Sequence, residues 1–166
     1  SMKPDLNKTG NDLYLEQSLV TGLIAAVIAI FILNCFWILS SVFFDRFFPW
    51  IAILQGIIIG KSIKKYGLGI EWYFPIMSFS LALFASVTGS FLCALYLTGR
   101  EFGTGAIILI DEISWHTISI FLMNDYGIVG IIYGLFSGVL AAFYSQRELD
   151  RNQAIAYRKY KESLKI

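Results

Sequence analysis

Long stretches without a charged side chain limit the fold of this 166-residue chain more than any other feature. Residues 19–44, 72–99 and 126–146 contain no Asp, Glu, Lys or Arg. A helix rises about 1.5 Å per residue, so roughly 20 apolar residues cross the hydrocarbon core of a membrane. Each stretch is long enough to be a transmembrane helix. Apolar residues form 57% of the chain and charged residues only 15%, which is unlike a water-soluble domain.

A fourth, shorter apolar stretch covers residues 47–60. It is followed by Lys61 and Lys64, whose long side chains can extend along the helix and keep their ammonium groups in the membrane interface. We therefore expect another span over residues 47–64. The sequence predicts one all-α integral membrane domain over residues 1–166. Its four transmembrane helices form a compact bundle at residues 19–44, 47–64, 72–99 and 126–146.

The basic residues predict how this bundle is oriented. With four spans, the N-terminal segment 1–18 and the tail 147–166 lie on the same side of the membrane. All 13 Lys and Arg residues except Arg46 and Arg100 also fall on that side. Basic residues favour the cytoplasmic side, so both termini are expected in the cytoplasm, with a bacterial inner membrane as the location. The net charge of +1 gives no basic surface of the kind that binds nucleic acid.

Small residues recur four positions apart within the predicted spans. Helices in lipid associate through close approach of their backbones and through hydrogen bonds, so these positions are expected at helix contacts. The predicted packing residues are Gly56, Gly60, Ala82, Ser86, Ser90, Gly130, Gly134 and Gly138. We expect most of them to close the bundle of a single chain, while the alternative is that one stripe makes a homo-oligomer.

Two amides, Asn34 and Gln55, are the most polar side chains within the spans. They lie on consecutive antiparallel helices and are expected to bond to each other, with a substrate contact as the alternative role. Cys35 and Cys93 lack the spacing of a redox or metal motif and are expected to be buried free thiols.

Residues 100–125 connect the third and fourth spans. The segment is too long for a tight turn and too apolar for a solvated loop. A fifth span would leave Asp111 and Glu112 stranded in lipid, so an interfacial or re-entrant helix on the outer surface is expected. The outer segments carry five acidic residues, namely Asp45, Glu101, Asp111, Glu112 and Asp125.

The outer segment also contains the only candidate for chemistry. Glu112 and His116 lie one helical turn apart, with Asp111 beside them, and are candidate catalytic residues. One carboxylate and one imidazole form at most half of a metal site, so Glu112 and His116 are metal candidates only in part. The alternative is an interfacial polar pair. No cofactor motif is present, and no cofactor is predicted.

The tail over residues 147–166 is expected to continue the last span as an amphipathic helix. Its excess of basic residues would allow it to rest on anionic lipid, while a solvated helix is the alternative.

Two functions follow from this pattern. The first is an oligomeric membrane subunit, either a pore or an accessory component of a membrane complex, because the spans carry packing residues and no catalytic set. The alternative is a membrane enzyme that acts on a lipid or isoprenoid head group at the outer surface through Glu112 and His116.

Overall fold

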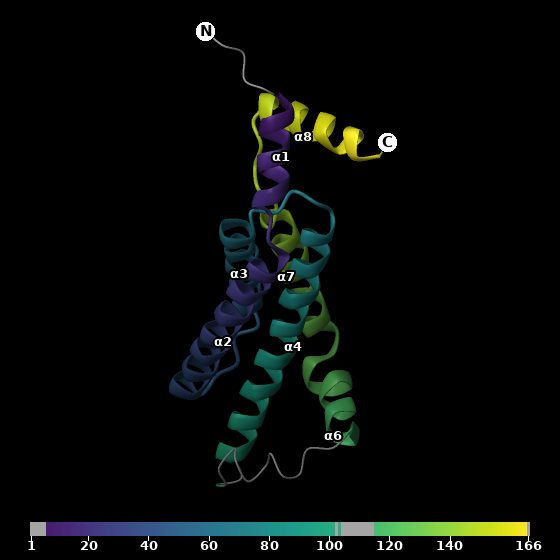
Figure 1. Cartoon of the computed structure of the whole chain (residues 1–166). Helices are drawn as coiled ribbons and strands as arrows, with labels where there is room; N and C mark the ends of the chain where they lie inside the picture. Colours follow the sequence, from purple (N-terminus) through teal and green to yellow (C-terminus); the bar gives the residue numbers. More distant parts are fainter. Residues whose placement is uncertain (1–5, 102, 104–114, 166) are drawn as a thin grey trace.

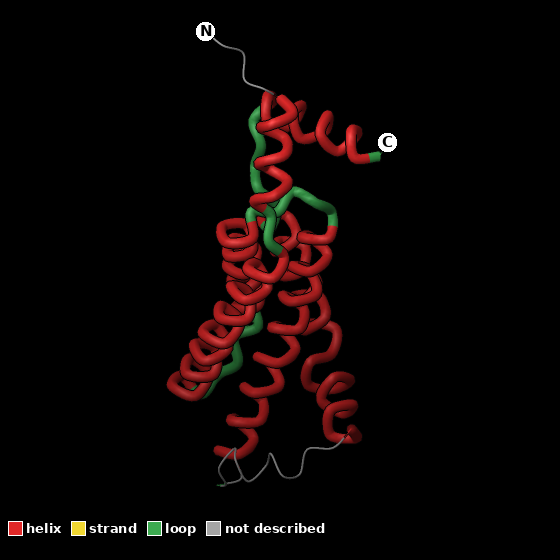
Figure 2. Tube along the Cα trace, in the orientation of Figure 1, coloured by secondary structure: helices red, strands yellow, loops and turns green. Residues whose placement is uncertain are grey.

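The computed structural model describes residues 6–101, 103 and 115–165, and every regular element in this part of the chain is helical (Figures 1 and 2). In chain order the helices are α1 (Leu6–Glu16), α2 (Leu19–Phe44), α3 (Ile51–Gly67), α4 (Tyr73–Glu101), α6 (Trp115–Ile120), the π-helix η1 (Phe121–Tyr126), α7 (Gly127–Tyr144) and α8 (Arg151–Leu164). Helices α2, α3, α4 and α7 pack side by side, whereas α1 and α8 lie together beyond one end of this bundle. The predicted all-helical fold is confirmed for the described residues.

Three of these helices are long and apolar enough to cross a membrane. They cover Leu19–Phe44, Tyr73–Gly99 and Gly127–Tyr144, and they coincide with three of the predicted spans. The chain therefore has the helices of a multi-pass membrane protein. The start of α2 is capped by Ser18, whose hydroxyl oxygen accepts a hydrogen bond from the backbone N–H of Thr21 at 3.2 Å.

Helix α3 is shorter and contacts both α2 and α7. Two glycines bring its backbone close to that of α7. A Cβ atom at Gly60 would lie 2.6 Å from the carbonyl oxygen of Ala141, and one at Gly56 would collide with the carbonyl oxygen of Ser137. A side chain at either glycine would therefore force the two helices apart.

The centre of the bundle is filled by apolar side chains from all four helices. The main buried cluster comprises Ala26, Ile30, Leu33, Ile59, Ile63, Phe74, Ala82, Ala85 and Ala141. A second cluster surrounds Trp37, which is fully buried. Ser78 of α4 donates a hydrogen bond to the carbonyl oxygen of Ala141 on α7 at 2.9 Å, which adds a polar tie to this packing.

The chain enters α7 through helix α6 and the π-helix η1. Gly127 follows η1 with φ of 52°, a conformation that glycine adopts without strain. Tyr126 is buried, and its hydroxyl oxygen lies 3.0 Å from that of Ser86 on α4. Residues 104–114 of the expected outer helix lie outside the described residues. The described part, α6, begins at the strongly exposed Trp115 and leads toward α7 (Figure 1).

Two polar helices lie beyond the bundle, and one of them was not expected from the sequence. Helix α1 occupies most of the N-terminal segment, for which no element was expected. The tail was expected to continue α7 as one helix, but α8 is a separate helix. The physical reason is a capping box. The Asp150 side chain accepts a hydrogen bond from the backbone N–H of Gln153 at 2.8 Å. The Gln153 side chain accepts one from the backbone N–H of Asp150 at 3.2 Å.

Candidate functional site

A buried carboxylate, Glu71, lies where α1 and α8 meet the end of the bundle. Only 8% of this residue is exposed, although it stands in the short connection between α3 and α4. One carboxylate oxygen accepts a hydrogen bond from the Tyr157 hydroxyl, and the two oxygens lie 2.7 and 2.9 Å from the ammonium nitrogen of Lys161. A carboxylate is costly to bury alone, so these two side chains of α8 stabilise its burial.

Burial and hydrogen bonding have opposite effects on the ionisation of Glu71. Burial raises the pKa of its carboxyl group, but the hydrogen bonds from Lys161 and Tyr157 and the charge of Lys161 lower it by more. The pKa of Glu71 therefore lies below its ordinary value. Burial, and then the hydrogen bond to this carboxylate, raise the pKa of the Tyr157 phenol. Near neutral pH the site therefore holds an ionised carboxylate and a neutral phenol.

The side chain of Gln17, just after α1, connects three parts of the chain. Its Oε1 accepts hydrogen bonds from the backbone N–H groups of Ile70 and Glu71 at 2.7 and 3.0 Å. Its Nε2 donates to the Tyr157 hydroxyl at 3.2 Å. Gln17 thus ties the end of α1 to the connection between α3 and α4 and to α8.

The linker after α7 is fixed to the same connection. Nε2 of Gln146 donates to the carbonyl oxygen of Ile70 at 2.8 Å, and the backbone N–H of Arg147 donates to that of Gly69 at 2.7 Å. The Arg147 guanidinium pairs with Glu16 at the end of α1. The side chains at the centre of this region are Gln17, Glu71, Gln146, Tyr157 and Lys161, and we call them the junction.

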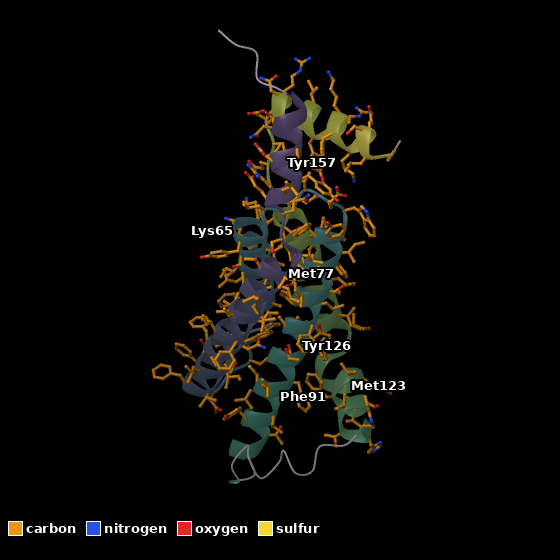
Figure 3. The ribbon with its side chains drawn as sticks, in the orientation of Figure 1. Lys65, Met77, Phe91, Met123, Tyr126 and Tyr157 are labelled. Atoms are coloured by element: carbon orange, nitrogen blue, oxygen red, sulfur yellow. The ribbon has the colours of Figure 1, made fainter. Side chains whose placement is uncertain are left out.

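Local sequence explains why α8 can supply two of these partners. Tyr157 and Lys161 are four residues apart, so they project from the same face of the helix. Figure 3 shows Tyr157 beside α1, at the same end of the molecule as Lys65. Gly10 brings α1 close to α8, because a Cβ atom there would lie 2.7 Å from that of Tyr160.

The junction was not expected from the sequence, because the tail was predicted to be a solvated or lipid-contacting helix. One signal was available. Glu71 is an acidic residue that follows Lys61, Lys64 and Lys65 on the predicted cytoplasmic side, directly before a long apolar stretch. An isolated acid at such a boundary is a reason to search for a basic partner elsewhere in the chain.

The two amides within the bundle form the hydrogen bond expected from the sequence. Nε2 of Gln55 donates to Oδ1 of Asn34 at 2.6 Å. Nδ2 of Asn34 in turn donates to the hydroxyl of Thr88 at 3.1 Å. The series of hydrogen bonds therefore connects α3, α2 and α4 inside the bundle.

Three buried polar atoms near this series have no hydrogen-bond partner within the described residues. They are Nε1 of Trp37, Oε1 of Gln55 and Oγ of Ser137. Buried polar groups normally have a partner, which is frequently an ordered water.

The predicted packing residues all lie on α3, α4 and α7. Gly56 and Gly60 contact α7, as described above, and the α4 residues Ala82, Ser86 and Ser90 are buried. On α7, a Cβ atom at Gly138 would lie 2.6 Å from the Phe79 ring of α4, and one at Gly134 would collide with the Tyr126 hydroxyl and lie 3.0 Å from Leu83 of α4. One at Gly130 would meet the Tyr126 ring of the same helical segment at 2.5 Å.

The acidic cluster predicted on the outer side is only partly described. Asp111 and Glu112 lie outside the described residues, and His116 is an exposed residue of α6. Among the described residues, no group of three His, Cys, Asp or Glu side chains could hold a metal ion. Both cysteines are free. Cys93 is buried as expected, whereas Cys35 lies on the exposed face of α2.

Comparison of the chain with protein-family models, curated proteins and solved structures finds no match.

Proposed function

We propose that the protein is a four-span protein of a bacterial inner membrane with both termini in the cytoplasm. Helices α2, α4 and α7 would be three of the spans and α3 the fourth. The contacts of α3 with α2 and α7 support this assignment, and Lys61 and Lys64 would let its short apolar part end at the interface. The position of nearly all basic residues on the side of the termini supports the orientation.

Cysteine labelling tests this topology. In a background with Cys35→Ser and Cys93→Ser, we expect an impermeant maleimide added outside intact cells to label Asp125→Cys and not Lys159→Cys. After the cells are opened, both cysteines should react. The opposite pattern in intact cells would contradict the proposed orientation.

Within this topology, the protein would act as a non-enzymatic accessory subunit of a larger membrane assembly. The junction carries this proposal. A buried carboxylate with two α8 partners fixes α1 and α8 to the end of the bundle, although neither helix is needed to stay in the membrane. A fixed position on rigid elements is what a binding surface for a partner requires.

The surface of α1 and α8 offers apolar contacts for such a partner. Leu15 on α1 is 68% exposed, and Leu164 on α8 is 53% exposed. Both belong to helices that lie beyond the apolar bundle (Figure 1). Single exposed leucines are common on protein surfaces, so these two residues are compatible with a partner contact, while the junction carries the proposal.

The other functions suggested by the sequence have less support. Trp37 and the apolar clusters fill the centre of the bundle, so a pore would have to form between copies of the chain. An enzyme would need Asp111, Glu112 and His116 to form a site, and two of these three residues lie outside the described part of the chain. The accessory role is therefore the function that the geometry supports best.

The mass of the protein extracted from its native membrane tests the accessory role. Extraction into polymer nanodiscs followed by native mass spectrometry should give a mass well above the 18.7 kDa chain with its bound lipids, with a second protein in the complex, whereas copies of this chain alone would favour the pore. A single chain as the sole species would contradict the proposal.

A junction variant connects this assembly to the proposed site. Glu71→Gln should lower the assembled fraction while the bundle remains folded, because α1 and α8 lose their fixed position. Glu162→Gln is the matched control, since Glu162 makes only an exposed ion pair with Arg158 at 3.8 Å. Equal assembly of Glu71→Gln and wild type, with α8 shown to be released, would mean that the junction does not present the partner surface.

A further inference from the structure

An open groove of about 600 Å³ lies at the end of the bundle that carries the junction. Its lining residues are Lys61, Lys64, Lys65, Leu68, Arg147 and Glu148. Four of these six side chains are basic and one is acidic, so the groove has an excess of positive charge. We call it the basic groove.

The lysines of the basic groove are not neutralised within the described part of the chain. Lys61, Lys64 and Lys65 have no carboxylate within salt-bridge distance there. Lys161 of α8, which is not part of the groove, is bound to Glu71. The ammonium groups of Lys61 and Lys65 lie over the rings of Tyr144 and Tyr66, 5.3 and 5.4 Å from the ring centres. Unpaired cations around a concave surface attract an anion.

The contact between α3 and α7 contains a second groove, which is apolar. It has a volume of about 410 Å³ and is lined by Ile53, Val129, Ile132, Tyr133 and Phe136. We call it the apolar groove. The two grooves share helix α3, which supplies Ile53 to the apolar groove and the three lysines to the basic groove, while Arg147 and Glu148 of the basic groove come from the linker that follows α7.

Helix geometry places the α3 residues of the two grooves on one face of that helix. From Ile53, steps of four, four and three residues lead along α3 to Lys64, and such steps keep to one side of a helix. The distance along the axis is roughly 16 Å, which is about the thickness of the hydrocarbon region of one membrane leaflet. A lipid with its head group in the basic groove would therefore extend its acyl chain to the apolar groove.

We infer that the α3–α7 contact binds one anionic phospholipid, with its phosphate in the basic groove and an acyl chain in the apolar groove. The phosphate oxygens would accept hydrogen bonds from the lysine ammonium groups and from Arg147, which Glu16 and the carbonyl oxygen of Gly69 hold in position. Basic pockets between transmembrane helices are a known type of lipid head-group site. The apolar groove favours a lipid over a soluble phosphate, because only a lipid fills both grooves.

Binding to the delipidated full-length chain in detergent tests this inference, with native mass spectrometry as the readout. Dioleoyl phosphatidylglycerol should remain bound in one copy, and dioleoyl phosphatidylcholine at the same concentration should not. Two anions without acyl chains, sn-glycerol 3-phosphate and inorganic phosphate, should bind much more weakly. Equal binding of either soluble anion would mean a site for a soluble phosphate and would overturn the lipid proposal, as would equal binding of the two lipids.

Charge variants locate the site on the protein. Lys61→Gln combined with Lys64→Gln should weaken phosphatidylglycerol binding by about fivefold per lysine, or roughly 25-fold together. Arg158→Gln combined with Lys159→Gln removes the same charge from the exposed surface of α8 and should leave this binding nearly unchanged. Circular dichroism and the melting temperature without lipid verify that all variants are folded.

The same pair of variants separates the groove from the tail. The sequence alone suggested that anionic lipid lies against residues 147–166. If the α8 variant loses phosphatidylglycerol and the α3 variant retains it, the lipid binds the tail helix and the proposed site on α3 and α7 is wrong.

Discussion

The contact between α3 and α7 and the junction hold helices together by different means. At the first, the absence of side chains at Gly56 and Gly60 allows two backbones to meet. At the second, the buried carboxylate of Glu71 accepts hydrogen bonds from Tyr157 and Lys161 of α8, and its backbone N–H donates to Gln17. One contact depends on volume and the other on charge.

The difference follows from the solvent around each contact. Lipid is as apolar as leucine, so helices in the bundle gain little from burying apolar surface and associate through close packing. In the proposed topology α1 and α8 lie outside the membrane and face water, where a buried ion pair with all partners present can specify one arrangement. The two contacts should therefore respond differently to changes in volume, charge and pH.

The largest effect is expected from a larger side chain in the α3–α7 contact. Gly60→Leu should lower the stability of the bundle by about 3 kcal/mol, because its Cβ meets the backbone of Ala141, which cannot move aside. Gly138→Leu should cost less, since its Cβ meets the side chain of Phe79, which has more freedom to shift. Thermal melts in detergent measure both changes.

Val139→Leu is the control for added volume on α7. Val139 is 57% exposed, so the extra methylene group should enter lipid or detergent at little cost. If Gly60→Leu melts at the same temperature as this control, close packing does not hold α3 against α7.

Loss of charge at the junction should have the next largest effect. Glu71→Gln keeps the shape of the side chain but removes the charge that pairs with Lys161, at a cost of about 1–2 kcal/mol. The loss should be local. Amide hydrogen exchange should increase in α8, while α4 and α7 keep their protection. Increased exchange throughout the bundle would show that the two regions are not independent.

Acid should loosen the junction without affecting the α3–α7 contact. Because the pKa of Glu71 is lowered in the fold, its contribution to stability is present above its unfolded pKa of about 4.3 and is lost as the pH falls through the folded value. The raised pKa of Tyr157 has the opposite consequence, and that contribution is lost as the pH rises above about 10.

Amide hydrogen exchange of α8, measured as a function of pH, should therefore show an acid limit and an alkaline limit to its protection. Protection, corrected for the intrinsic exchange rate, should be constant between about pH 5 and 9 and should fall on both sides. Glu71→Gln should remove the acid limit. An acid limit that persists in this variant would have to come from another carboxyl group.

The smallest effect is expected within the bundle, where a single hydroxyl is removed. Thr88→Val takes away the acceptor for Asn34 and should cost about 0.6 kcal/mol. Ser80→Ala is the matched control, because the Ser80 hydroxyl donates only to the carbonyl oxygen of Ile76 in its own helix, at 2.9 Å. Thermal melts that show a larger loss for Ser80→Ala would contradict a stabilising role of the Asn34 contact.

Part of this architecture could be predicted from local sequence. The uncharged stretches predicted the three long helices within one or two residues at most ends. The bond between Asn34 and Gln55 could be predicted too, because consecutive antiparallel helices place two mid-span amides at similar depth. In both cases the thickness of the membrane sets the length of a spanning helix, so the place of a residue in the sequence predicts its depth in the membrane.

The separation of α8 from α7 could have been predicted but was missed. Asp150 and Gln153 have the spacing of a capping box, which marks the start of a helix. The absence of Gly and Pro after Tyr144 pointed instead to a continuous helix. Here one local signal outweighed another, and the hydrogen bonds of the cap decided the result.

The sequence could mark Glu71 as an isolated acid, but it could not identify the partners of Glu71 in the junction. Tyr157 is 86 residues from Glu71 and 140 residues from Gln17 along the chain, and no periodic pattern relates them. By itself the sequence determined which helices are apolar enough for a membrane, because hydropathy and length are local properties. Only the tertiary structure decided which charges are buried and which stay free, because the partner of a charged side chain is set by how distant helices pack.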